Sequence, residues 1–293
     1  MTILSAHAKV NLDLRVRARR SDGFHEVRSL IQSIDLADSV SVDLAEDDAV
    51  SVGGDTDLGA DEDNLAWRAV EAVRRASSSL ARLAVHLDKR IPVAAGLGGG
   101  SADAAAALVA TAGLLGVGER QVRALAPGLG SDVPVCLTGG SVLVEGRGEV
   151  LTPVQLPSDY HLAVVTPPFS LSTKEVFAAW DRLDGPHGPS LDGSALPPGL
   201  REYGPLVNDL VPAALVVRPD LGDWVAECSR VWGQEAMMTG SGPTVFGFFV
   251  TADEADDAVL AIDGRFGAAA SPVDRGWDGS PGGTLPAPPW GVV

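Results

Sequence analysis

The sequence predicts a protein of mixed α and β structure that is arranged in two domains. Its 293 residues exceed the usual size of a single hydrophobic core. Segments with strand-like alternation and segments with helical periodicity both recur along the chain. Pro153 and Pro157 punctuate a connection at which the composition changes. We therefore expect an N-terminal domain at residues 1–153 and a C-terminal domain at residues 154–293.

Composition and charge exclude several classes of protein. No apolar run reaches the ~20 residues of a membrane span, so we expect no membrane partner. The chain opens into an alternating pattern with charges at Lys9 and Asp13, unlike a signal peptide. The two cysteines are too few for a disulfide framework or a cysteine-based metal site. The net charge of −17 argues against a nucleic-acid partner, which would need a basic patch. A cytoplasmic protein is expected.

Two regions of the N-terminal domain carry polar residues that need an explanation. Apolar and polar residues alternate from Val10 to Arg17, which predicts a half-buried strand with Lys9, Asn11 and Asp13 on one face. A turn at Asp22-Gly23 then precedes Phe24 and His25. A solvated strand face and a surface loop are the ordinary interpretations of these two regions.

The other elements follow from periodicity, caps and turn residues. In the first domain we expect a strand over 27–44, a loop over 46–61, a helix capped by Asp63 and ending at Ala76, a strand over 83–91, helices over 101–115 and 119–126, and a strand over 141–144. In the second we expect a strand from His161, a helix capped by Ser172 or Thr173, a mobile loop over 184–204, helices from Asn208 and over 222–232, an apolar strand after Thr244, a helix over 254–262, and a flexible tail over 268–293.

The segment from Pro92 to Ala105 is the strongest functional signal. Four of the five residues from Gly96 to Gly100 are glycine, and an alanine-rich helical segment follows from Ser101. Glycine has no side chain to pack in a core. Ser favours the start of a helix, and Ala favours its continuation. A helix N-terminus preceded by a flexible loop offers unpaired N–H groups and a partial positive charge. This arrangement is typical of phosphate binding.

Two common phosphate loops do not match this segment. A P-loop requires Lys after its glycines, and none follows Gly100. The dinucleotide fingerprint fails because Ser101 occupies its last glycine position. An ordinary glycine-rich turn before a helix is the structural alternative. Similarly, Asp132 in Gly130-Ser131-Asp132-Val133-Pro134 has a turn or capping role as its ordinary interpretation.

Three separated segments resemble the motifs of the GHMP kinases, the galactokinase, homoserine, mevalonate and phosphomevalonate kinase superfamily. They are Ala8-Lys9-Val10-Asn11-Leu12, Pro92–Ala105 and the second glycine turn, Thr239–Phe246. Further segments narrow the match to the branch that acts on a cytidine-diphosphate-linked polyol, namely Asp22–Glu26, Gly130–Pro134, Gly146–Glu149 and Asn208–Leu210. The resemblance covers nearly the whole chain from Lys9 to about Phe249.

The resemblance implies a fold, an activity and partners. The fold is α+β, with an N-terminal domain like ribosomal protein S5 domain 2 and a ferredoxin-like C-terminal domain. The activity is ATP-dependent phosphorylation of the 2-hydroxyl of a cytidine-diphosphate-linked methylerythritol in non-mevalonate isoprenoid synthesis. ATP with Mg²⁺ is the expected cofactor, no dedicated metal motif is expected, and the partners are small molecules bound by a monomer or weak homodimer.

The resemblance also assigns residues. Lys9 and Asp132 match the catalytic pair, which suits a hydroxyl that must lose its proton to a carboxylate beside a cation. The positions that match ATP-binding residues are Asn64, Pro92, Val93, Ala94, Ala95, Gly96, Leu97, Gly98, Gly99, Gly100, Ser101, Ala102, Gly240 and Ser241. The positions that match acceptor-binding residues are Asn11, Phe24, His25, Thr173 and Phe177, with the two phenylalanines expected to stack on the base.

The chain departs from the family pattern at three positions. Phe24 stands where Tyr is usual, Ala102 replaces a second serine, and Pro243 replaces a small residue and so removes an N–H donor. Two other functions stay open. A homoserine or mevalonate type of kinase would have no use for a base-reading pair, and a catalytically silent nucleotide-binding relative would not need Lys9 and Asp132.

Overall fold

Two long antiparallel strands, β1 (Thr2–Arg19) and β2 (His25–Leu44), organise the first sheet. The computed structural model describes residues 2–53 and 64–279. In this seven-stranded sheet the order is β13-β1-β2-β4-β3, and β5 and then β6 extend it from β2. All its pairs are antiparallel except β3 with β4. The other strands are β3 (Ala49–Gly53), β4 (Leu83–Asp88), β5 (Ser141–Gly146), β6 (Val150–Val154) and β13 (Trp277–Gly279).

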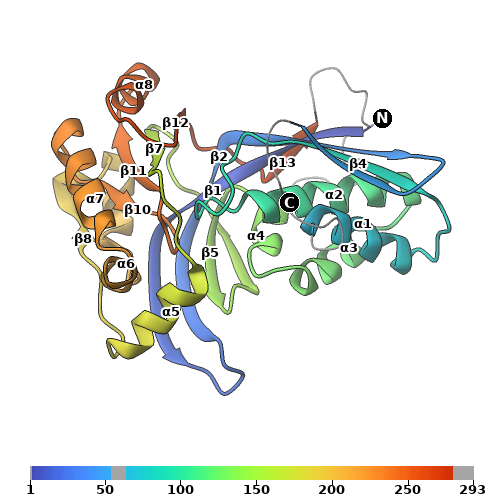
Figure 1. Cartoon of the computed structure of the whole chain (residues 1–293), viewed down its shortest axis with the longest axis horizontal. Coiled ribbons are helices and arrows are strands. Elements are labelled where there is room, and N and C mark those ends of the chain that lie inside the picture. Colours follow the sequence, from blue (N-terminus) through green and yellow to red (C-terminus); the bar gives the residue numbers. More distant parts are fainter. Residues whose placement is uncertain (1, 54–63, 280–293) are drawn as a thin grey trace.

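Helices cover one face of this sheet (Figure 1). They are α1 (Leu65–Ala76), α2 (Gly99–Leu115), α3 (Glu119–Leu125) and α4 (Val133–Thr138). The α1 helix buries a stripe of Ala66, Ala69, Val70 and Val73 against the core, as its periodicity predicts. Its expected cap, Asp63, lies outside the described residues, and the side chain of Asn64 accepts hydrogen bonds from the first helical N–H groups instead.

The α2 helix lies at the centre of the N-terminal core. Its alanine run from Ala104 to Ala107 is fully buried, because it packs between α1 and the strands β1 and β2. Small side chains let the helices approach closely, and Ala has the highest helix propensity. The α2 N-terminus, at the end of the glycine loop, is therefore held by a buried helix.

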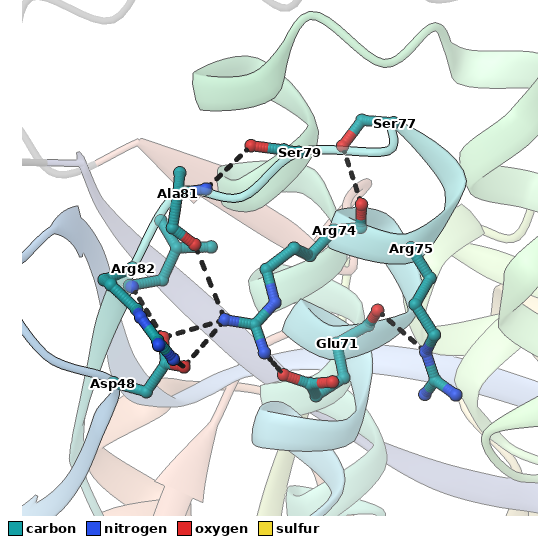
Figure 2. Close-up of polar contacts among 9 residues, drawn as sticks. Asp48, Glu71, Arg74, Arg75, Ser77, Ser79, Ala81 and Arg82 are labelled. Carbon is teal, nitrogen blue, oxygen red and sulfur yellow. Dashed lines mark hydrogen bonds and ion pairs between the residues drawn. The ribbon is translucent and has the colours of Figure 1, made fainter.

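A polar network joins the end of α1 to the loop before β3 (Figure 2). Arg74 donates two 2.8 Å hydrogen bonds to the carboxylate of Asp48 and also contacts Glu71. Two further donors to Asp48 come from the start of β4, namely the Arg82 side chain and the Leu83 N–H. Burial alone raises the pKa of Asp48. The hydrogen bonds outweigh that effect and lower this pKa from 3.8 to about 2.

The second sheet has four strands in the order β10-β11-β7-β12, all antiparallel. Helices α6, α7 and α8 gather around it, and α5 lies beside the tip of the β1–β2 hairpin (Figure 1). The elements are β7 (His161–Thr166), α5 (Thr173–Arg182), α6 (Val211–Val217), α7 (Asp220–Trp232), β10 (Met237–Met238), β11 (Val245–Phe249), α8 (Ala252–Leu260) and β12 (Phe266–Ala270).

Several expected loops are ordered elements. The expected loop over 46–61 contains β3, with 54–61 outside the described residues. The expected mobile loop over 184–204 contains β8 (Ser190–Leu191), which pairs with β9 (Leu206–Val207), and two 3₁₀ helices, Gly193–Ala195 and Pro198–Tyr203. The short α4 was not expected either. In each case buried side chains and strand pairing outweigh a loop-like composition.

The expected flexible tail over 268–293 is wrong for residues 268–279. Residues up to Ala270 complete β12 in the second sheet, and β13 then pairs with β1 in the first sheet. Residues 280–293 lie outside the described residues. The first sheet thus takes a strand from the C-terminal part of the chain, and the boundary at 153/154 stays a prediction. No helix in the described ranges is long and apolar enough to cross a membrane.

Candidate active site

Lys9 is a buried charge at the centre of β1. Its Nζ donates to Asn11 Oδ1 at 2.7 Å and to the Gly96 carbonyl at 3.0 Å. Asn11 is itself buried, and its Nδ2 donates to Ser29 Oγ at 2.8 Å. The ordinary interpretation, a solvated strand face, is therefore wrong for Lys9 and Asn11. These hydrogen bonds hold the ammonium group of Lys9 in place. A functional cation must be held in this way, whereas an exposed lysine would not be.

Asp132 completes a pair with Lys9. Its Oδ2 lies 3.4 Å from Lys9 Nζ, and its side chain is 40% exposed while that of Lys9 is 6% exposed. Asp132 stands at the N-cap position of α4, but its side chain makes no capping hydrogen bond. Its other oxygen lies 3.4 Å from Ser131 Oγ. The carboxylate is therefore held by Lys9 and open to solvent, so a capping role does not account for it.

The three motif segments converge around Lys9. The Lys9 N–H donates to the Leu97 carbonyl at 3.0 Å, and the Asn11 N–H donates to Thr239 Oγ1 at 2.8 Å. A Cβ on Gly96 would lie 3.0 Å from the carbonyl oxygens of Thr239 and Gly242. Glycine at 96 is thus required by close backbone approach as well as by its φ of +83°.

The glycine loop lines a cleft of about 510 Å³ at the N-terminus of α2. The cleft is lined by Pro92–Ser101 together with Asn64, and Gly98, with a φ of +74°, starts the helix. Asn64 Oδ1 caps α1, and its Nδ2 has no partner among the described residues. First-turn N–H groups have no partner within a helix. The cleft therefore presents donors to an anion.

Three further positions that match nucleotide-binding residues do not line this cleft. Ala102 is fully buried and its N–H donates to the Gly98 carbonyl, because it already belongs to the helix. Gly240 and Ser241 do not line the cleft. A Cβ on Gly240 would lie 3.1 Å from Asn11 Oδ1, which places this residue beside the Lys9 network. Ser241 is hydrogen-bonded to Thr173 at 2.7 Å, and Thr173 does line the cleft.

The residues expected on the acceptor side include one pair of stacked rings. The ring of His25 stacks on that of Phe177, with centroids 5.2 Å apart and 26° between the planes. Phe24 makes no ring contact with Phe177; its side chain is exposed and the Arg147 guanidinium carbon lies 5.3 Å from its centroid. The expected stacking of both phenylalanines on a base needs no contact between their rings, and it stays a prediction. The structure brings together His25, at the start of β2, and Phe177, on α5.

The sequence interpretation missed a buried charge cluster beside the cleft. Lys89 contacts Asp38 and donates to Asp103 Oδ2 at 2.6 Å. Burial, together with the charge of Asp38, raises the pKa of Asp103 despite Lys89. The two carboxylates outweigh burial and raise the pKa of Lys89. One signal was present, since Lys89 is one of only three lysines in the chain.

The arrangement suits proton removal from a hydroxyl beside a bound polyphosphate. Asp132 can accept a proton, Lys9 can stabilise the resulting negative charge, and the helix N-terminus can hold phosphate oxygens. Cys136 is buried, and burial and Asp132 raise the pKa of its thiol, so it is no nucleophile. Within residues 2–53 and 64–279 no group of three or more His, Cys, Asp or Glu side chains is placed to hold a metal ion.

The chain is similar in sequence to known kinases. The family model for the GHMP kinases N terminal domain matches residues 64–140. A relative from Corynebacterium efficiens, named 4-diphosphocytidyl-2-C-methyl-D-erythritol kinase, is 41% identical over 88% of each chain. One from Heliobacterium modesticaldum with the same name is 35% identical over 90% of this chain and 91% of its own.

Solved structures confirm the mixed α and β fold. A crystal structure of 4-(cytidine 5'-diphospho)-2C-methyl-D-erythritol kinase superposes with a TM-score of 0.77 at 34% identity, covering 92% of this chain and 98% of its own. A homoserine kinase from Cytophaga hutchinsonii superposes with a TM-score of 0.67 at 18% identity, covering 95% of this chain and 97% of its own. The second likeness is one of fold alone.

Proposed function

This chain belongs to the 4-diphosphocytidyl-2-C-methyl-D-erythritol kinase family of the GHMP kinases, and we propose that it phosphorylates the 2-hydroxyl of 4-diphosphocytidyl-2-C-methyl-D-erythritol with ATP. Relatives at 35–41% identity that carry this name support the assignment. The observation that carries it is the contact between Lys9 and Asp132, held beside the glycine-loop cleft. In this proposal the enzyme acts in non-mevalonate isoprenoid precursor synthesis, in the cytoplasm, as a monomer or weak homodimer.

The glycine-loop cleft and the Lys9–Asp132 pair have separate roles in the reaction. MgATP is the donor substrate, and the first-turn N–H groups of α2 receive its phosphates in this proposal. Asp132 accepts the proton of the acceptor hydroxyl as its oxygen attacks the γ-phosphorus. The bond from that phosphorus to the bridging oxygen breaks, and ADP leaves with the electron pair. Lys9 stabilises the charge that develops on the attacking oxygen.

The acceptor is proposed to bind between the two sheets. Asn11 is buried beside Lys9, and Thr173 lies at the start of α5 next to the cleft. His25, at the start of β2, and Phe177, on α5, form an aromatic surface. A base recognised there would hold its attached polyol toward Asp132. Binding energy from that remote base would then position the reacting hydroxyl.

A panel of acceptors tests this function. ADP release is measured with 4-diphosphocytidyl-2-C-methyl-D-erythritol, free methylerythritol phosphate, homoserine and mevalonate. We expect the cytidylated alcohol to have the highest kcat/KM, and methylerythritol phosphate to lose kcat as well as affinity because it lacks the base. Homoserine or mevalonate turning over faster would move the protein to another branch of the superfamily. No turnover of any acceptor would favour a catalytically silent relative.

A further inference from the structure

The imidazole of His25 contacts a carboxylate that the proposed acceptor site does not include. His25 Nε2 lies 2.7 Å from Asp181 Oδ1, on the last turn of α5. The other oxygen of Asp181 lies 4.0 Å from Arg19 Nη1. Phe177 and Trp180 contact the His25 ring, by stacking and edge-on, with centroids 5.2 and 5.3 Å away. The ring of His25 is thus fixed on three sides by α5.

This contact decides which ring nitrogen carries the proton. An ionised carboxylate only accepts hydrogen bonds, so the Nε2 that faces it must be the protonated nitrogen. In a neutral imidazole the other nitrogen is then an acceptor. His25 Nδ1 has no hydrogen-bond partner in the described part of the chain and is not among the buried atoms that lack one. It is therefore open to a ligand, and it offers a lone pair.

A lone pair at this position distinguishes the two pyrimidines. Cytosine carries an exocyclic amine that donates a hydrogen bond, whereas uracil carries an oxygen there, which only accepts. We propose that Asp181 selects cytosine over uracil by holding His25 in the tautomer whose Nδ1 accepts. Asp181 is thus a positioning residue that acts through His25, and the inference rests on the proposed function.

The test compares two acceptors in four forms of the enzyme. The acceptors are the cytidine- and uridine-diphosphate esters of methylerythritol, and the forms are wild type, Asp181→Asn, Asp181→Glu and Asp184→Asn. Asn at 181 can turn either its oxygen or its NH₂ toward His25, so it no longer selects a tautomer. Glu keeps the carboxylate. Asp184 is exposed just beyond α5 and has no side-chain partner in the described ranges, which makes its variant the matched control.

We expect the wild type to prefer the cytidine ester by roughly 10- to 100-fold in kcat/KM. In Asp181→Asn this preference should fall to within about 3-fold, mainly through a higher KM for the cytidine ester, with KM for ATP unchanged. Asp181→Glu should restore most of the preference, and Asp184→Asn should behave as the wild type.

Two outcomes overturn the inference while the function stands. The first is a folded Asp181→Asn enzyme that keeps the wild-type preference. The second is an equal loss of activity with both esters, which would mean that Asp181 only supports the packing of α5. A wild type that phosphorylates neither ester overturns the proposed function and the inference with it.

A measurement on the free enzyme does not depend on either acceptor. Nitrogen-15 NMR of the imidazole of His25, assigned with a His25→Gln variant, reports which nitrogen is protonated. We expect a proton on Nε2 in the wild type and a mixture of tautomers in Asp181→Asn. A proton on Nδ1 in the wild type would contradict the mechanism directly.

Discussion

At the scale of single residues, Asp132 carries the sharpest chemical prediction. Asp132→Asn keeps the shape of the side chain but removes the group that accepts the hydroxyl proton. We expect kcat to fall by roughly 10²–10⁴-fold with little change in KM for ATP. Steady-state ADP release measures both. Asp47→Asn, an exposed change with no described side-chain contact, is the matched control, and turnover near the wild-type value would leave Asp132 a turn residue.

Single residues also show which parts of the candidate site could be predicted from the sequence. Lys9 and Asp132 were paired only through a family resemblance, and the structure brings their charged atoms to 3.4 Å. The stacking of Phe24 and Phe177 on a base comes from the same resemblance and stays a prediction, whereas the stack of His25 on Phe177 is visible only in the structure. Lys89 was missed because its partners, Asp38 and Asp103, come from different elements.

At the scale of elements, a substitution in the glycine loop tests its role in nucleotide binding. A Cβ on Gly98 would lie 3.0 Å from Lys9 Cγ and Cε, and the φ of +74° adds about 1–2 kcal/mol of strain for a side-chain-bearing residue. Gly98→Val should therefore raise KM for ATP by at least about 10-fold and also lower kcat through Lys9.

The control for this change is Gly118→Val, since a Cβ there meets no atom within 4 Å and the backbone is extended. Nucleotide affinity is measured by titration of folded protein, with circular dichroism as the check on folding. Equal ATP affinity in a folded Gly98→Val variant would rule this loop out as the phosphate site.

The network at the end of α1 predicts an acid-sensitive contribution to stability. The pKa of Asp48 is lowered to about 2 in the fold, against an ordinary value of 3.8. A lowered pKa stabilises the fold above the ordinary value, and this contribution is lost as pH falls from about 4 to about 2. Asp48→Asn should thus lower Tm at pH 6 and lose that deficit near pH 2. A deficit that is the same at both pH values would contradict the role of the charge.

Elements were predicted best where local sequence and burial agree. The α2 helix follows from its alanine run, and α5 from its capping serine, which accepts from the Glu175 N–H. Short β3 and α4 were missed because their stability comes from partners distant in sequence, β4 in one case and the core around α2 in the other. Local composition carries no record of such pairing.

At the scale of the whole molecule, the path of the C-terminal segment was the main failure of prediction. Its composition of Gly, Pro and Ala without periodicity indicates a frayed end. Instead, β13 pairs with β1 as an edge strand of the first sheet, and Trp277 Nε1 donates to the Leu137 carbonyl at 3.2 Å. Strand pairing across the length of a chain is set by tertiary packing, which a single sequence does not display.

A close backbone contact just before β13 predicts the effect of adding one methyl group there. A Cβ on Gly276 would lie 1.6 Å from the Cys136 carbonyl oxygen, on the helix that begins beside Asp132. Gly276→Ala must therefore push β13 and α4 apart. We expect a loss of about 1–3 kcal/mol and a Tm lower by roughly 2–12 °C, with reduced kcat because Asp132 moves with α4. Gly128→Ala, whose Cβ meets nothing within 4 Å, is the control. Equal melting of the two variants in thermal denaturation would show that this contact contributes nothing to stability.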